Sequence, residues 1–330
     1  MSREIVLVSR ELRPLLDGES PEWPGGAATR WVAPSEELPL SERVVALIPL
    51  LSRDIAGTEM DRLPRLRVVA NYAVGYDNVD VKAARERGVA VTNTPGVLTE
   101  ATADLTWALI LAAARRMREG LELATSGRWE GWTPDQLLGA GLQEKRLGIL
   151  GAGRIGSAVA RRAPGFGMDV LYWSRSENAE LERAVGARRE EELGDLLSAS
   201  DVLSVHLPLT DDTGGLLDAA ALERMRPGSV LVNTARGEIV ETEALAGALR
   251  SGPLAAAGLD VYPNEPEIPA SLRELPKAFV LPHLGSATRE ARTGMWRIAR
   301  DNVRSVLAGS GPVTPVPEST NPGAPDARGD

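Results

Sequence analysis

The stretch "ILGAGRIGSAVARR" (149–162) limits the possible folds of this chain more than any other feature. Its glycines, Gly151, Gly153 and Gly156, come directly after an apolar run and directly before a run of small residues. Between a strand and a helix, the first glycine permits a tight turn, the second admits a pyrophosphate, and the third lets helix and strand pack closely. The motif therefore predicts a dinucleotide-binding α/β domain. A merely flexible loop is the weaker alternative in this setting.

Short apolar runs alternate with helical patterns on both sides of the motif, which is typical of βα repetition. Four strands are expected before it, at 4–9, 44–51, 66–74 and 89–94. Six are expected from the motif onward, at 146–153, 169–174, 201–208, 229–235, 255–261 and 278–283. One long helix is expected from Thr99 to about Met117.

With 330 residues, the chain is long for a single core. We predict two Rossmann-like, doubly wound parallel-sheet domains of the α/β class. A flavodoxin-like domain would comprise residues 1–98 and 285–312, and a dinucleotide-binding domain residues 99–284. Residues 119–145, rich in Gly and Trp, are expected to leave the compact fold, and residues 313–330 to form a flexible Pro/Gly-rich tail.

The composition excludes several classes of protein. A net charge of -9 argues against binding to nucleic acid or to an anionic membrane, both of which need a basic face. The longest apolar runs, at 44–51 and 107–114, are too short to span a bilayer. The absence of cysteine removes disulfides and thiolate metal sites, and no metal site is expected. We expect a cytoplasmic protein whose redox chemistry comes from a bound cofactor.

The strand at 169–174 ends without the acidic residue that NAD-binding proteins use to bind the adenosine ribose. Its tip carries Ser174, Arg175 and Ser176, and Asp169 lies at its far end. Hydroxyls and a guanidinium suit a 2'-phosphate. NADP(H) is therefore the preferred cofactor, and NAD(H) remains possible if Arg175 is only a solvated surface residue.

Three ionisable side chains follow separate strands of the second sheet. They are Arg236 in "LVNTARGEIV", Glu265 in "GLDVYPNEP" and His283 in "VLPHLGSAT". Because the carboxyl ends of parallel strands share one edge, we expect them to converge. A carboxylate beside an imidazole favours the imidazolium and fixes its tautomer, and a guanidinium binds carboxylates bidentately. The trio predicts a proton donor beside an anion site, although each residue alone could be structural.

Two further strand exits give less specific signals. His206 in "SVHLPLTDDT" is expected to contact a cofactor without transferring a proton, and Pro208 and Thr213 to shape its loop. In "NYAVGYDNVD", the amides of Val74 and Gly75 could bind an anion, although a plain βα turn explains the same residues.

The motifs "GAGRIG", "NTARG", "DVYPNEP" and "PHLGSAT", in this order and spacing, resemble the D-isomer-specific 2-hydroxyacid dehydrogenases over nearly the whole chain except the tail. Within that family, "ANYAVGYDNVDV", "VTNTPGVLTEATAD" and "LYWSRS" are similar to glyoxylate and hydroxypyruvate reductases. The resemblance implies NAD(P)H-dependent reduction of a small 2-keto acid to glycolate or D-glycerate. A phosphite, phosphoglycerate or D-lactate dehydrogenase remains an alternative, as does a nucleotide-sensing protein of the co-repressor type.

The resemblance also implies roles for individual residues. Arg236, Glu265 and His283 match the catalytic trio. Leu51, Arg53, Val74 and Gly75 would contact the substrate together with Arg236 and His283, which makes residues 1–98 and 285–312 the substrate-binding domain. The implied cofactor contacts are Thr102, Gly151, Gly153, Arg154, Ile155, Gly156, Ser174, Arg175, Ser176, His206, Leu207, Pro208, Thr213, Thr234, Ala235, Asp260, Gly285 and Ser286.

By the same resemblance, residues 119–145 form an arm that embraces a second subunit, so a homodimer is expected. Trp132 of the partner subunit would then reach the substrate. Packing within the interface is an equally good account of Trp132.

Overall fold

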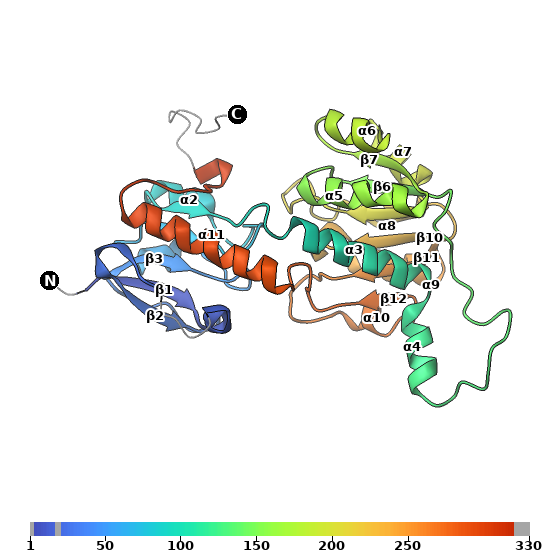
Figure 1. Ribbon diagram of the computed structural model, residues 1–330, viewed down its shortest axis with the longest axis horizontal. Helices are drawn as coiled ribbons and strands as arrows, with labels where there is room; N and C mark the ends of the chain where they lie inside the picture. The colour runs from blue at the N-terminus through green and yellow to red at the C-terminus, as the bar shows by residue number, and fades with distance from the viewer. Residues whose placement is uncertain (1–2, 17–20, 320–330) are drawn as a thin grey trace. The chain divides into compact units, whose positions relative to one another are not determined.

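The chain divides into two compact units, each built around one parallel sheet (Figure 1). Of the described residues, 3–16, 21–98 and 288–319 form the five-stranded unit, and 99–287 form the seven-stranded unit. The computed structural model describes residues 3–16 and 21–319. Two parallel-sheet α/β units are what the sequence predicts, so the expected fold class is confirmed.

The five-stranded sheet has the order β2-β1-β3-β4-β5, and all its pairings are parallel. Its strands are β1 (Ile5–Ser9), β2 (Ala28–Val32), β3 (Val44–Ile48), β4 (Val68–Ala70) and β5 (Ala90–Thr92). Its helices are η1 (Arg10–Leu16), η2 (Pro24–Gly26), α1 (Gly57–Asp61), α2 (Val81–Glu86), α11 (Arg289–Leu307) and η5 (Pro317–Ser319). The edge strand β2 is absent from the sequence prediction.

The last described residues differ from the flexible tail that the sequence predicts from residue 313. Val316 is buried, and its amide donates to the carbonyl of Val91 in β5. The Thr314 hydroxyl donates to the carbonyl of Asn93 at 2.6 Å. The prediction is therefore wrong for 313–319, because one buried apolar side chain and backbone pairing hold a Pro-rich segment against the sheet. Residues 320–330 lie outside the described residues.

The seven-stranded sheet has the order β12-β11-β10-β9-β6-β7-β8, again wholly parallel. Its strands are β6 (Arg146–Leu150), β7 (Asp169–Trp173), β8 (Arg188–Arg189), β9 (Val202–Val205), β10 (Ser229–Asn233), β11 (Leu254–Leu259) and β12 (Ala278–Val280). Six of these strands agree with the sequence prediction. The seventh, β8, has two residues, which is too short to produce an alternating pattern.

Helices cover both faces of this sheet. One face packs against α3 (Thr99–Ala114) and α5 (Arg154–Arg162), where the Trp107 indole donates to the carbonyl of Val159 (Figure 1). The other packs against α7 (Leu193–Ala199), α8 (Ala219–Glu223) and α9 (Thr242–Arg250). The remaining helices are η3 (Ala163–Phe166), α6 (Ala179–Val185), η4 (Gly237–Ile239) and α10 (Ala270–Arg273).

The helix predicted to reach Met117 ends earlier, at Ala114. Arg116 adopts a left-handed backbone conformation with φ of 51°, which interrupts the helix, and its side chain pairs with Glu119. A separate helix, α4 (Met117–Thr125), then begins the predicted arm, and 126–145 contain no helix or strand. Within 3–16 and 21–319, no helix is long and apolar enough to cross a membrane.

Candidate active site

The loop between β6 and α5 holds the glycine motif. Gly151 has φ of 100°, and a Cβ built on it would lie 2.9 Å from the carbonyl carbon of His206, so only glycine fits there. Beside Gly153, at the start of α5, the same construction meets no atom within 4 Å. The free amides at a helix N-terminus attract anions. The open space at Gly153 therefore fits the pyrophosphate of a dinucleotide, held by the amides around Arg154 and Ile155.

The loop after β7 carries Ser174, which is half-buried, and Arg175 and Ser176, which are exposed. Asn178 ties this loop to the glycine motif, because its side-chain amide donates to the carbonyl of Ala152 at 2.9 Å. The backbone amide of Asn178 also donates to the hydroxyl of Tyr172 at 2.9 Å. The serine and arginine side chains thus stand on an anchored turn next to the glycine motif.

The loop after β9 begins at His206, whose amide donates to the carbonyl of Leu150 in β6. Its ring Nε2 lies 2.8 Å from the hydroxyl of Ser204. Burial lowers the pKa of His206 from 6.5 to about 3, so the ring is neutral near pH 7. Further along, the Thr213 hydroxyl donates to the carbonyl of Pro208 at 2.7 Å and so shapes the loop. Leu207 packs beside Gly151.

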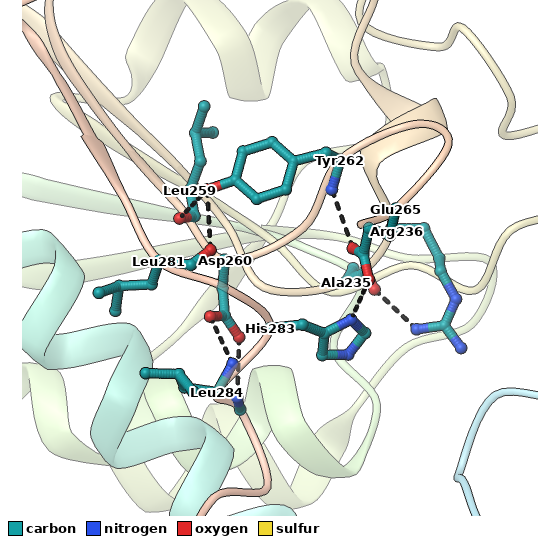
Figure 2. A network of polar contacts seen from close by, with 10 residues as sticks. Ala235, Arg236, Leu259, Asp260, Tyr262, Glu265, Leu281, His283 and Leu284 are labelled. Carbon is teal, nitrogen blue, oxygen red and sulfur yellow. Dashed lines mark hydrogen bonds and ion pairs between the residues drawn. The ribbon is translucent and has the colours of Figure 1, made fainter. Parts of the chain in front are cut away.

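The loop after β10 places Arg236 beside Glu265 (Figure 2). The Asn233 side chain folds this loop, since it donates to the carbonyl of Arg236 at 2.7 Å and accepts from the amide of Ala235 at 2.9 Å. A Cβ on Gly237 would lie 2.1 Å from the carbonyl carbon of Tyr262. A glycine at 237 is therefore required for the loops after β10 and β11 to approach each other.

Glu265 and His283 form the central contact of the site. The Glu265 Oε2 atom lies 2.7 Å from Nδ1 of His283, and Oε1 accepts from the amide of Tyr262 at 3.0 Å (Figure 2). Burial acts to raise the pKa of Glu265. The hydrogen bond and charge of His283, the Tyr262 amide and the charge of Arg236 outweigh burial and lower that pKa. An ionised Glu265 accepts from Nδ1–H and leaves Nε2 of His283 for exchange with another molecule.

Asp260 holds the loop that carries His283. Its carboxylate is buried and accepts from the amides of Leu284 at 2.7 Å and Gly285 at 2.8 Å (Figure 2). Burial raises the pKa of Asp260, although both amides oppose the shift. His283 itself has φ of 54°, an uncommon conformation for a residue with a side chain. The hydrogen bonds that these two amides donate to Asp260 hold His283 in that conformation.

The start of α3 contacts the same loops. The Thr102 hydroxyl donates to the carbonyl of Gly285 at 3.0 Å, one residue before Ser286. The Thr106 hydroxyl lies 3.0 Å from that of Thr234. Side chains of α3 therefore connect the two loops that carry the predicted cofactor residues Thr234 and Gly285.

In the five-stranded unit, the predicted substrate residues lie in two loops after β3 and β4. Arg53, which follows Leu51, is buried and donates to the carbonyls of Ala33 at 2.5 Å and Glu36 at 2.6 Å. The carbonyl of Val74 accepts from Asn93, and that of Gly75 accepts from Asn71. Arg53 thus braces the 33–36 loop, and substrate contact by these four residues stays a prediction.

Trp132, predicted to reach a partner's substrate, has an exposed side chain in the single chain, at 78%. Its role stays a prediction.

Sequence reasoning missed the residues that hold the site together. Asn233, Tyr262 and Thr106 each bind a backbone or side-chain group of a predicted site residue. Asn178 binds the carbonyl of Ala152, between Gly151 and Gly153 of the glycine motif. The signal for Asn233 was its position at the end of β10, two residues before Ala235. Thr106 had a weaker signal, a polar position one turn after Thr102 and directly before the apolar second half of the helix.

Residues 107–285 match the NAD binding domain of the D-isomer specific 2-hydroxyacid dehydrogenases. A glyoxylate reductase of Aeropyrum pernix is 46% identical over 320 residues, which cover 94% of this chain and 95% of that protein. A glyoxylate reductase of Thermococcus litoralis is 45% identical over 273 residues, 82% of each chain.

A solved structure also resembles this chain. The NADPH-dependent glyoxylate/hydroxypyruvate reductase of Sinorhizobium meliloti, in complex with NADP and malonate, is 34% identical, with a TM-score of 0.86. The match covers 96% of this chain and 98% of the other.

Proposed function

Because the chain belongs to the D-isomer-specific 2-hydroxyacid dehydrogenase family, we propose that it reduces glyoxylate to glycolate and hydroxypyruvate to D-glycerate. The observation that carries this proposal is the 2.7 Å contact between Glu265 and His283 beside the guanidinium of Arg236. A carboxylate-paired imidazole next to a cation suits a substrate that is both an acid and a carbonyl compound. The names of the relatives point to the same substrates.

The cofactor is a nicotinamide dinucleotide. When bound, it supplies the hydride that reduces the keto carbon. The chain's own part is to bind it: the loop after β6 would hold the pyrophosphate, and the loop after β7 the adenosine ribose.

NADP(H) is the preferred form in this proposal. The described turn from Ser174 to Ser176 offers hydroxyls and a guanidinium where NAD-binding proteins present a carboxylate. Asp169 is exposed at the opposite end of β7. The Sinorhizobium meliloti relative is NADPH-dependent by name, which supports the same preference.

His283 is the proton donor in this mechanism. Glu265 accepts from Nδ1, which fixes the tautomer and leaves Nε2 to deliver a proton to the carbonyl oxygen. Glu265 remains ionised because its pKa is lowered. The Glu265 carboxylate therefore stays ionised at all pH values near 7.

Arg236 binds the substrate carboxylate and stabilises the negative charge that develops on the carbonyl oxygen. A guanidinium offers two parallel N–H donors, a geometry that matches a carboxylate. The hydrogen bond from Asn233 and the close approach at Gly237 hold the Arg236 backbone. Such preorganised donors contribute strongly in acyl and carbonyl chemistry.

A homodimer formed through the arm at 119–145 is part of the proposal. Trp129, Trp132 and Leu138 on this segment are exposed in the single chain. A cavity of about 710 Å³ lies next to the arm, at the amino ends of β10 and β11, and Leu138 and Phe279 help to line it. Exposed apolar side chains beside an apolar hollow are typical of a surface that a partner covers.

The test is an initial-rate comparison of glyoxylate, hydroxypyruvate and pyruvate with NADPH and NADH, together with phosphite in the oxidative direction. We expect glyoxylate and hydroxypyruvate to react fastest, with NADPH as the better reductant. Arg236→Gln should lower kcat/KM by roughly 10²-fold or more, and Arg236→Lys should recover only part of it because lysine lacks the planar fork. Faster turnover of phosphite or pyruvate, or negligible turnover of every substrate, would overturn the proposal.

A further inference from the structure

Arg189 on β8 reaches the end of the neighbouring strand β7. In the parallel register, Arg189 pairs with Tyr172, two residues before Ser174. Its Nη2 atom donates to the carbonyl of Ser174 at 3.2 Å. The guanidinium of Arg189 therefore lies at the turn that carries Ser174, Arg175 and Ser176, although it comes from a different strand.

The hydrogen bonds of Arg189 are incomplete. Its Nε atom is buried and, among the described residues, has no hydrogen-bond partner. Its Nη1 atom lies 3.6 Å from Glu191, whose side chain is 76% exposed. A buried N–H without an acceptor costs free energy, and a loose pair with an exposed carboxylate contributes little to stability. Arg189 therefore has donor capacity that its own chain does not use.

An anion at this turn would complete the set of hydrogen bonds. A phosphate offers several strong acceptors, and arginine binds phosphates through paired N–H groups. Glu191 can move away at small cost because it is exposed and not closely hydrogen-bonded to Arg189. The turn is fixed by Asn178 in the free protein, so binding an anion there loses little further conformational entropy.

We propose that Arg189 is a specificity-determining residue that, together with Arg175, binds the 2'-phosphate of NADP(H). This inference rests on the NADP(H) preference proposed above. One of the two arginines that bind the phosphate then comes from β8, a two-residue strand that belongs neither to the glycine motif nor to the turn after β7. A purely structural role, bracing the Ser174 carbonyl, is the rival account, and the experiment separates the two.

The direct test measures binding of two nucleotide fragments, 2',5'-ADP and 5'-AMP, to the full chain by calorimetry. The fragments differ only in the 2'-phosphate. Arg189→Gln should weaken 2',5'-ADP at least tenfold and change 5'-AMP less than twofold. Arg189→Lys should recover part of the loss, because it restores the charge.

Arg188→Gln is the matched control. Arg188 is exposed and lies on the same two-residue strand, and its replacement removes the same unit of charge. Because successive side chains of a strand point to opposite faces, this variant should leave both affinities within twofold. Equal weakening of both fragments in Arg189→Gln would indicate a brace for the turn and overturn the proposal. An unchanged affinity for 2',5'-ADP would overturn it as well.

A kinetic measurement gives an independent readout. Arg189→Gln should raise KM for NADPH about tenfold while kcat at saturation and KM for NADH stay near those of the parent enzyme. A fall in kcat with both nucleotides would contradict a role confined to the 2'-phosphate. Because neither fragment contains a nicotinamide, their binding reports on Arg189 even if glyoxylate proves to be the wrong substrate.

Discussion

Two loops of the seven-stranded unit each carry one of the chain's two histidines, and their surroundings differ. His206 follows β9, and its ring faces the hydroxyl of Ser204 at 2.8 Å. His283 follows the last strand, β12, and its ring faces the carboxylate of Glu265 at 2.7 Å. Burial lowers the pKa of His206 to about 3, whereas His283 lies beside an ionised carboxylate.

The comparison indicates that position after a strand does not by itself make a histidine a candidate proton donor. Both residues occupy the carboxyl edge of the same sheet, where ligands bind. A neutral hydroxyl cannot stabilise an imidazolium, and a carboxylate can. The partner of the ring separates the two proposed roles.

The largest expected effect comes from replacing the proposed proton donor. His283→Gln should lower kcat for glyoxylate reduction by roughly 10²- to 10⁴-fold, the range that general acid catalysis contributes. His206→Gln, which retains a donor and acceptor near Ser204, should stay within about tenfold. Steady-state kinetics of the two variants measure the difference. A similar loss in both would remove the distinction between the two loops.

Replacing the carboxylate should have a smaller effect. Glu265→Gln keeps the size and an acceptor near Nδ1 but removes the charge, so kcat should fall by about 10- to 10²-fold. Glu265→Asp retains the charge at a shorter reach and should fall less. Kinetics measured at saturating nucleotide check this order. If Glu265→Gln kept full activity, the partner of the ring would not define the role of His283.

The smallest effect concerns acid stability and involves His206. In the unfolded chain this residue binds a proton below about pH 6.5, and in the folded chain only near pH 3. Between these values the unfolded state binds more protons, so stability falls as pH falls, by about 1 kcal/mol per pH unit. Above pH 6.5 the neutral ring contributes no pH dependence.

Thermal unfolding at pH 4.5 and pH 7 measures this contribution. Tm of His206→Gln should drop less on acidification than Tm of the parent chain. His283→Gln provides the comparison, since the ring of His283 pairs with a carboxylate and not with a hydroxyl. An equal acid-induced drop for the parent and His206→Gln would show that burial of His206 does not oppose protonation.

The sequence predicts the long, strongly patterned elements of the fold and misses the short ones. Buried strands such as β3 and β10 are continuous apolar runs. β2 is an edge strand of mixed character, "ATRWV", flanked by Pro and Gly. β8 has two arginines. Only pairing with a distant strand gives such segments their structure, and a single sequence does not display that pairing.

The candidate site shows the same division. Arg236, Glu265 and His283 can be proposed as candidates from the sequence alone, because their residue types and their positions after strands suit the chemistry, and the structure brings them together. The bond from Arg189 to Ser174 and the bond from Thr106 to Thr234 join segments that no local pattern connects. Contacts of this kind depend on the register of neighbouring strands and on helix packing. Neither can be predicted from a local sequence pattern.

Residues from the N-terminal part of the chain and the described residues from α11 onward build the five-stranded unit, and this has a consequence for synthesis. Val316 pairs with Val91 in β5, and α11 packs on the same unit, whereas residues 99–287 form a unit of their own. A ribosome releases 99–287 before α11 and its continuation emerge. In the nascent chain, the seven-stranded unit should therefore fold first. At that point the first 98 residues still lack α11 and its continuation, and the edge of β5 is unpaired. That interval is when a chaperone would be of most use to this protein.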